Sequence, residues 1–243
     1  MSDTSISLSI LIGTRQRLRT VSPVASPTIA GIPIYFSEAI KPLWVTLERN
    51  LTLYKHLSSL SRSIHFYTRA LRHIRPALSE SMAATQGASW RNPDWTTPTP
   101  LCNGMSASNM HKLQSAQNSL TRVVLTSLSH LSASERLSYL HWLPVNYRIQ
   151  FKIATLTYKT LATCQPSYLY NLLQLHQLSR ALRSSTQQLL QVPYMSTDFG
   201  RRAFSYSSPA TLNSIPTSIN NCSSLYSFKR HLKSHLIAQL INN

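Results

Sequence analysis

Apolar residues recur along this chain at the alternating three- and four-residue spacing that is typical of amphipathic helices. The longest series covers residues 53–74, and Pro76 ends it because proline interrupts a helix. We expect one face of this helix to lie in the core of a helical bundle. The positions that carry the pattern are Leu53, Leu57, Leu60, Ile64, Tyr67, Leu71 and Ile74.

Three further helices are predicted from the same period. The first covers residues 106–128, with Ser106 or Ser108 as its N-cap. Pro144 favours the start of the second, over residues 145–161. Ser223 or Ser224 caps the third, which runs to Leu240. The positions expected to be buried are Met110, Leu113, Ala116, Gln117, Leu120, Val124, Leu128, Val145, Ile149, Ile153, Leu156, Thr160, Leu225, Phe228, Leu232, Leu236 and Leu240.

Weaker patterns indicate a few short elements. Residues 6–12 and 32–36 alternate in the manner of short strands. Ser132 and Glu135 form the capping box that opens a short helix. The sequence therefore predicts a mainly α protein: a helical bundle with a small β remnant at the N-terminus and a helical C-terminal region.

Three segments are expected to connect these elements. Residues 86–104 predict a linker, because Pro and Thr are frequent there. Residues 165–191 predict a short helix followed by a polar segment. Residues 192–216, which are punctuated by proline, predict a connector rich in β-turns.

The charge balance is unusual, because 24 Lys and Arg residues face only 7 Asp and Glu residues, for a formal net charge of +17. Of the cations, 17 are Arg, whose planar guanidinium suits bidentate contact with phosphate. Such a surplus favours a polyanionic partner, with nucleic acid ahead of an anionic membrane surface. The alternative is a composition that has drifted without selection for binding.

Nothing in the sequence indicates secretion or a membrane span. Residues 4–14, the first uncharged stretch of the chain, are too short to cross a bilayer, and MSD is not a basic signal-peptide start. Cys102, Cys164 and Cys222 are odd in number and widely spaced, which argues against a disulfide framework and a zinc site. We expect an intracellular protein of the nucleus or the cytoplasm.

Two of the expected helices carry cations away from their apolar faces. In the first, Lys55, Arg62 and Arg69 recur every seven residues, and no acidic residue between positions 49 and 79 can pair with them. In the second, no acidic residue occurs from position 136 to 197. These faces either contact phosphates or are merely solvated. The candidate nucleic-acid-binding residues are Lys55, Arg62, Arg69, Arg72, Arg75, Arg148, Lys152 and Lys159.

Two other groups of residues each allow two interpretations. Tyr147, Phe151 and Tyr158 stack on bases if they are exposed, or pack in the core as large aromatic residues more often do. His231 and His235 stand four residues apart, a spacing that can chelate zinc on a helix. No third ligand or general base lies near them in the sequence, which favours a solvated pair.

The sequence does not predict catalysis by this chain. Asp3, Asp94 and Asp198 are its three aspartates, and none stands beside another acid. No GxSxG turn is present to orient a nucleophilic serine. We therefore expect no catalytic residue, no bound metal and no cofactor.

Three blocks of the sequence carry a resemblance to a known family. Residues 140–170 read LHWLPVNYRIQFKIATLTYKTLATCQPSYLY, and residues 105–125 read MSASNMHKLQSAQNSLTRVVL. The third block runs from GRRAFSYSSPATLNSIPTSI to LYSFKRHLKSHL, within residues 200–236. Together, and in this order, they resemble the region from the thumb onward in LINE-type (non-LTR) retrotransposon reverse transcriptases. Residues 13–57 are similar to the family's tail of the palm.

The resemblance implies a division of the chain. Residues 1–50 would be a remnant of the palm, residues 51–128 thumb-like helices interrupted by the linker, and residues 129–243 the C-terminal helical region. The family's polymerase holds two Mg²⁺ ions on palm aspartates, and this chain has no such aspartate cluster. The implied partners are RNA or an RNA–DNA duplex and, for a fragment, the palm and fingers of a parent polymerase.

The resemblance breaks within residues 86–103, and the genetic code offers a reason. Read two bases out of frame, the codons of Asp94, Trp95 and Thr96 give Leu-Asp, and the neighbouring codons permit Ser-Arg before and Tyr-Ala-Asn-Ser after. This matches what the family has at that point. Residues 90–100 are therefore either a frame-shifted translation or an unrelated proline-rich loop.

We interpret the chain as a truncated, degenerate C-terminal portion of such a reverse transcriptase. Its expected activity is sequence-tolerant binding of RNA or RNA–DNA duplex through backbone phosphates. One alternative is a helical fragment that binds another protein through an unsatisfied apolar seam. Another is a non-functional pseudogene product that does not fold stably.

Overall fold

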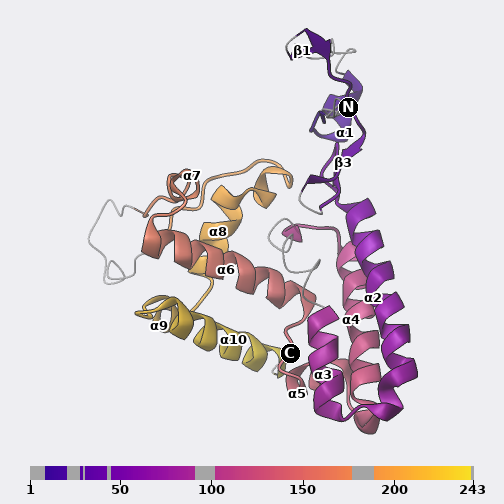
Figure 1. Ribbon diagram of the computed structural model, residues 1–243. Helices are drawn as coiled ribbons and strands as arrows, with labels where there is room; N and C mark the ends of the chain where they lie inside the picture. The colour runs from indigo at the N-terminus through magenta and orange to yellow at the C-terminus, as the bar shows by residue number, and fades with distance from the viewer. Residues whose placement is uncertain are drawn as a thin grey trace, which may run out of the picture.

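The computed structural model describes residues 9–20, 28–29, 31–42, 45–90, 102–176 and 189–241. Over these ranges the protein is mainly α-helical, as the periodicity predicts (Figure 1). None of the described helices combines the length and the apolar character that crossing a bilayer requires.

The N-terminal part contains short elements. Helix α1 (Arg15–Thr20) is followed by β1 (Thr28–Ile29), which pairs antiparallel with β2 (Ile32–Pro33). A second antiparallel pair joins β3 (Ala39–Ile40) to β4 (Leu47–Glu48). The expected strand at residues 6–12 is reduced, in its described part, to a single bridge between Ser9 and Phe36.

Helices α2 (Tyr54–Ile74), α3 (Glu80–Trp90) and α4 (Ala107–Val124) form a bundle in which α2 and α4 lie side by side (Figure 1). A 3₁₀ turn, η2 (Arg75–Ala77), follows α2, and Pro76 lies within it. Most of the predicted apolar seam is buried against α4. The side chain of Ser106 caps α4 by accepting a hydrogen bond from the amide of Asn109.

The seam departs from the prediction at its C-terminal end, where Tyr67 and Ile74 are exposed. A strict seven-residue apolar repeat drifts by about 20° per heptad around a straight helix with 3.6 residues per turn. The next inward position after Ile64 is therefore Thr68, which is 3% exposed. Its hydroxyl donates to the Ile64 carbonyl at 2.7 Å, which satisfies the buried oxygen.

The expected linker begins later than predicted, because α3 continues through Trp90. Small residues allow this helix to pack closely on its neighbours, and Ala83 and Gly87 are buried. A Cβ atom on Gly87 would lie 2.9 Å from Cη2 of Trp142. The proposed frame-shifted segment lies outside the described residues, apart from the backbone of Trp90.

The C-terminal region begins after the 3₁₀ turn η4 (Thr126–Leu128) with α5 (Ala133–Tyr139), and Ser132 and Glu135 form the predicted capping box. Helix α6 (Val145–Thr163) begins directly after Pro144, as expected. The remaining elements are α7 (Ser167–Tyr170), η5 (Gly200–Arg202), α8 (Phe204–Asn213), α9 (Thr217–Asn220) and α10 (Leu225–Ile241).

The prediction of a β-turn-rich connector over residues 192–216 is wrong, because α8 lies within it. Helix α8 packs on α6 through small side chains, and the Ser208 hydroxyl hydrogen-bonds to the Thr157 hydroxyl. An internal proline, Pro209, concealed the helix, since proline ordinarily interrupts one.

Helix α6 joins the two halves of the molecule (Figure 1). Val145, Ile149 and Ile153 pack in the same core as the α2 seam. Ala154, on the next face, packs with Phe228 and other residues of the C-terminal core. The two regions therefore share one helix, and its position is fixed from both sides.

Candidate nucleic-acid interface

The outer face of α2 carries the exposed cations that the sequence singled out. Helix α2 lies at the edge of the bundle, and its apolar face turns toward α4 (Figure 1). Lys55, Arg62, Arg69 and Arg72 are all exposed. We call these four residues the α2 basic face. Among the described residues, none of the four forms an ion pair with a carboxylate within 4.0 Å.

An exposed aromatic side chain stands within this face. Phe66 is 68% exposed, and its ring packs edge-on against Tyr67 at 5.5 Å between centroids. It follows Arg62 by four residues and precedes Arg69 by three, so it lies between them on the helix surface. Phe66 is not among the residues predicted from the sequence, although a large aromatic residue outside the apolar seam was a readable signal. Cations around an exposed ring suit a nucleic-acid strand, whose phosphates and bases they can contact together.

Arg75 does not belong to the α2 basic face. Its Nε donates to the carbonyl of Val124 at 3.1 Å, and its Nη1 donates to the carbonyl of Leu78 at 2.8 Å. Val124 is the last residue of α4, where carbonyl groups lack partners within the helix. Arg75 therefore holds the end of α4 against the turn after α2, which corrects its assignment as a phosphate ligand.

The second predicted set, on α6, separates into three environments. Arg148 is 7% exposed and its Nη2 donates to the Leu143 carbonyl at 3.2 Å, so the expectation that it lies away from the core is wrong. Lys159 is exposed, as expected. Lys152 is half-buried. Burial lowers the pKa of Lys152, and the nearby charges of Lys229 and Arg148 lower it further.

This α6–α10 cation cluster (Arg148, Lys152 and Lys229) brings like charges together from two helices. Repulsion among them destabilises the fold, and an anion placed there would relieve it. However, the Arg148 guanidinium already donates to the Leu143 carbonyl, and Lys152 is only partly accessible to solvent. The cluster is therefore a weaker candidate for phosphate contact than the α2 basic face.

The three aromatic residues of α6 pack in the core instead of facing solvent. Tyr147, Phe151 and Tyr158 are partly buried against the C-terminal core. The ring of Tyr158 stacks on Phe228 at 4.2 Å, and its hydroxyl donates to the Cys222 carbonyl. Of the two interpretations of these residues, packing is the one that the structure supports.

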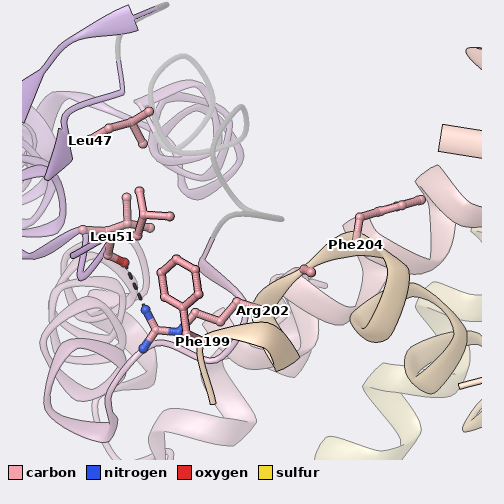
Figure 2. Close-up of a pocket in the computed structure, with 7 residues that line it drawn as sticks. Leu47, Leu51, Phe199, Arg202 and Phe204 are labelled. Carbon is pink, nitrogen blue, oxygen red and sulfur yellow. Dashed lines mark hydrogen bonds between the residues drawn. The ribbon is translucent and has the colours of Figure 1, made fainter. Parts of the chain in front are cut away.

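An apolar cavity of about 330 Å³ lies where η5 approaches the segment before α2 (Figure 2). Nη1 of Arg202 donates to the carbonyl of Leu51 at 3.0 Å and so connects the two segments. The cavity has mostly apolar walls and a single guanidinium, whose buried Nε has no hydrogen-bond partner among the described residues. One cation among apolar walls does not suit a phosphate. Its lining residues are Leu47, Leu51, Leu53, Phe199, Arg202, Ala203 and Phe204.

The described residues do not fit a magnesium site of the kind that the resemblance implies for an intact polymerase. Within the described ranges, no three His, Cys, Asp or Glu side chains come together. Asp198 lies 3.8 Å from Arg201 and is exposed. Nδ1 of His231 lies 3.3 Å from Sγ of Cys222. His235 is half-buried.

The fold and this surface define a mainly α-helical protein with a basic, aromatic-bearing outer helix. Comparisons with protein-family models, with curated proteins and with solved structures find no match for the chain.

Proposed function

We propose that this chain binds RNA or an RNA–DNA duplex through backbone phosphates, as the thumb and post-thumb portion of a non-LTR reverse transcriptase. The observation that carries the binding proposal is the α2 basic face, where four exposed cations share the outer surface of the helix with Phe66 and no acidic residue lies in the helix. The reverse-transcriptase assignment is supported by the sequence resemblance alone.

The spacing of the cations suits a polyanion. At 1.5 Å per residue, the span from Lys55 to Arg72 is roughly 25 Å along the helix axis. A nucleic-acid strand presents charges throughout such a length. Contacts to phosphates carry no sequence information, so the proposed binding is sequence-tolerant.

The test is the salt dependence of RNA binding by the full chain. Arg62→Gln with Arg69→Gln should weaken binding and reduce the log–log salt slope by about 1.4–1.8, because each phosphate that is neutralised contributes roughly 0.7–0.9 to that slope. The matched control is Arg17→Gln with Arg122→Gln, which removes two exposed cations from other helices. Circular dichroism and a thermal melt should show that all variants fold.

Equal slopes for the wild-type chain and the α2 variant would refute the proposal. An equal reduction in the control variant would also refute it, because binding would then follow total charge and not this face. The rival proposal of a protein-binding apolar seam is less favoured, because α4 packs on the seam residues Leu57, Leu60 and Ile64.

A further inference from the structure

A cleft of about 430 Å³, lined mainly by charged residues, opens beside the N-terminal end of α2. Three segments build it: the end of α1, the region of β3, and the turn that leads from β4 into α2. Main-chain hydrogen bonds hold these segments together, from the Gly13 amide to the Arg49 carbonyl at 2.9 Å and from the Arg49 amide to the Glu38 carbonyl at 3.3 Å. The cleft is lined by Leu18, Arg19, Glu38, Glu48, Arg49, Asn50 and Lys55.

Three cations line this cleft without an ion-pair partner. Among the described residues, no carboxylate lies within 4.0 Å of a charged nitrogen of Arg19, Arg49 or Lys55. The Nε of Arg49 is buried and has no hydrogen-bond partner. A buried guanidinium nitrogen without an acceptor is costly, and an anionic oxygen would satisfy it with a strong, charge-assisted bond.

The two acidic residues leave room for an anion. Oε2 of Glu48 accepts a hydrogen bond from the Thr52 hydroxyl at 2.7 Å and a longer one from the Lys55 amide at 3.4 Å. This carboxylate is therefore committed to the first turn of α2. Oδ1 of Asn50 also accepts from the Thr52 hydroxyl, at 3.3 Å. Glu38 remains as a hydrogen-bond acceptor, which inorganic phosphate cannot use well but the hydroxyl groups of a sugar can.

The cleft is continuous with the α2 basic face, because Lys55 belongs to both. Arg62 and Arg69 follow Lys55 at seven-residue steps, on nearly the same side of the helix. In the other direction, α1 and β3 stand beyond the N-terminal end of α2 (Figure 1). A strand that lies along the face would reach these elements at the cleft.

We propose that this cleft binds the terminal phosphorylated nucleotide of the strand that lies along α2, with Arg19, Arg49 and Lys55 around the phosphate monoester. A terminal monoester carries up to two negative charges where an internal phosphate carries one, so it is the species that three cations lining one cleft favour. This inference rests on the proposed function, since it names the part of the nucleic acid that one end of the interface recognises.

The test compares three single-stranded RNA oligonucleotides of one sequence: 5′-phosphorylated, 3′-phosphorylated, and with hydroxyl groups at both ends. On the full chain, a phosphate at one end should raise affinity about tenfold, as expected for one additional charge-assisted hydrogen bond. Arg19→Gln with Arg49→Gln should remove this gain. Arg62→Gln with Arg69→Gln should weaken binding of all three oligonucleotides and leave the ratio between them unchanged.

Two further variants keep the test valid if the double variant folds poorly. Arg19 is exposed, so Arg19→Gln alone should keep the fold and reduce the tenfold ratio. Arg49→Lys preserves the charge and should retain part of the tenfold affinity ratio. The inference is overturned if no terminal phosphate improves binding, or if the improvement survives in Arg19→Gln and in the double variant. Failure of the proposed function has a different signature, a salt slope that does not respond to Arg62 and Arg69.

Discussion

Replacing Arg75 by glutamine separates an arginine that stabilises the fold from the neighbouring arginines that are free to bind. Arg75 is half-buried and donates to the carbonyls of Val124 and Leu78. Arg72, one turn earlier on α2, is exposed and belongs to the α2 basic face. Both carry the same charge, so the two substitutions change the net charge of the chain equally.

The magnitude follows from the two hydrogen bonds. A hydrogen bond from a charged donor contributes about 1.5–3 kcal/mol of net stability, and a cation near a helix C-terminus adds about 0.3–1 kcal/mol. Fully buried, the two bonds and the helix end would together give about 3–7 kcal/mol, and because Arg75 is only half-buried we expect less than this sum. Arg75→Gln should therefore reduce the free energy of unfolding by about 2–3 kcal/mol. Arg72→Gln touches no such group and should stay within about 0.5 kcal/mol of the wild-type chain.

The assay is urea denaturation followed by circular dichroism, with RNA binding measured on the same samples at a temperature where every variant is folded. Arg75→Gln should lose stability and keep the salt slope of RNA binding. Arg72→Gln should keep stability and lower the slope by about 0.7–0.9. The reasoning is refuted if Arg75→Gln unfolds at the wild-type urea concentration, or if it lowers the slope as much as Arg72→Gln does.

Three other predictions concern packing and charge. Gly87→Ala should destabilise the chain in a thermal melt, because overpacking against Trp142 and Val124 costs about 1–3 kcal/mol and outweighs a helix-propensity gain of at most about 1 kcal/mol. In a Trp142→Phe background, where the 3.1 Å approach to Cγ2 of Val124 remains, the same change should cost less. The pKa of Lys152 lies below its ordinary value of 10.5, because burial and nearby cations disfavour the charged form. The free energy of unfolding should therefore rise as pH increases through the folded-state pKa toward 10.5. Urea titrations of Lys152→Met should lack this rise. The Ser132 amide and hydroxyl lower the pKa of Glu135 from 4.5. This carboxylate should therefore stabilise α5 above pH 4.5 and lose its effect as pH falls through the folded-state pKa. An acid titration of Glu135→Gln should not show this loss.

Local rules predicted the helices well because each rule depends on neighbours in sequence. The apolar period located α2, α4, α6 and α10, and the capping residues Ser106 and Ser132 marked two of the helix starts. Ser224 similarly accepts a hydrogen bond from the Ser227 amide near the start of α10. The positions of these elements follow from side-chain chemistry within one or two turns.

The roles of individual arginines could not be predicted in the same way, since their partners lie far away in the sequence or in a turn. The acceptor of Arg75 at Val124 is 49 residues distant, and no sequence rule joins them. Arg148 lies on α6 beside the apolar face, and a guanidinium at such a boundary turns inward when a carbonyl such as that of Leu143 is available. Helix α8 was missed for a related reason, because its small buried residues pack by fit to α6 and show no amphipathic period.

The same distinction bears on what the net charge of +17 means for binding. Four arginines donate to main-chain carbonyls of other segments or turns and so cross-link the fold: Arg75, Arg136, Arg148 and Arg202. Two of them, Arg136 and Arg148, are less than a tenth exposed and cannot reach a phosphate without unfolding.

Only cations that meet phosphates release counterions, so the salt dependence reports the phosphates that are neutralised and not the total charge. The four cations of the α2 basic face correspond to a log–log slope of about 2.8–3.6. A slope well above this range would require cations beyond this face. Arg19 and Arg49 of the cleft are two such cations, and α10 offers a second surface with the exposed residues Lys229, Arg230 and Lys233.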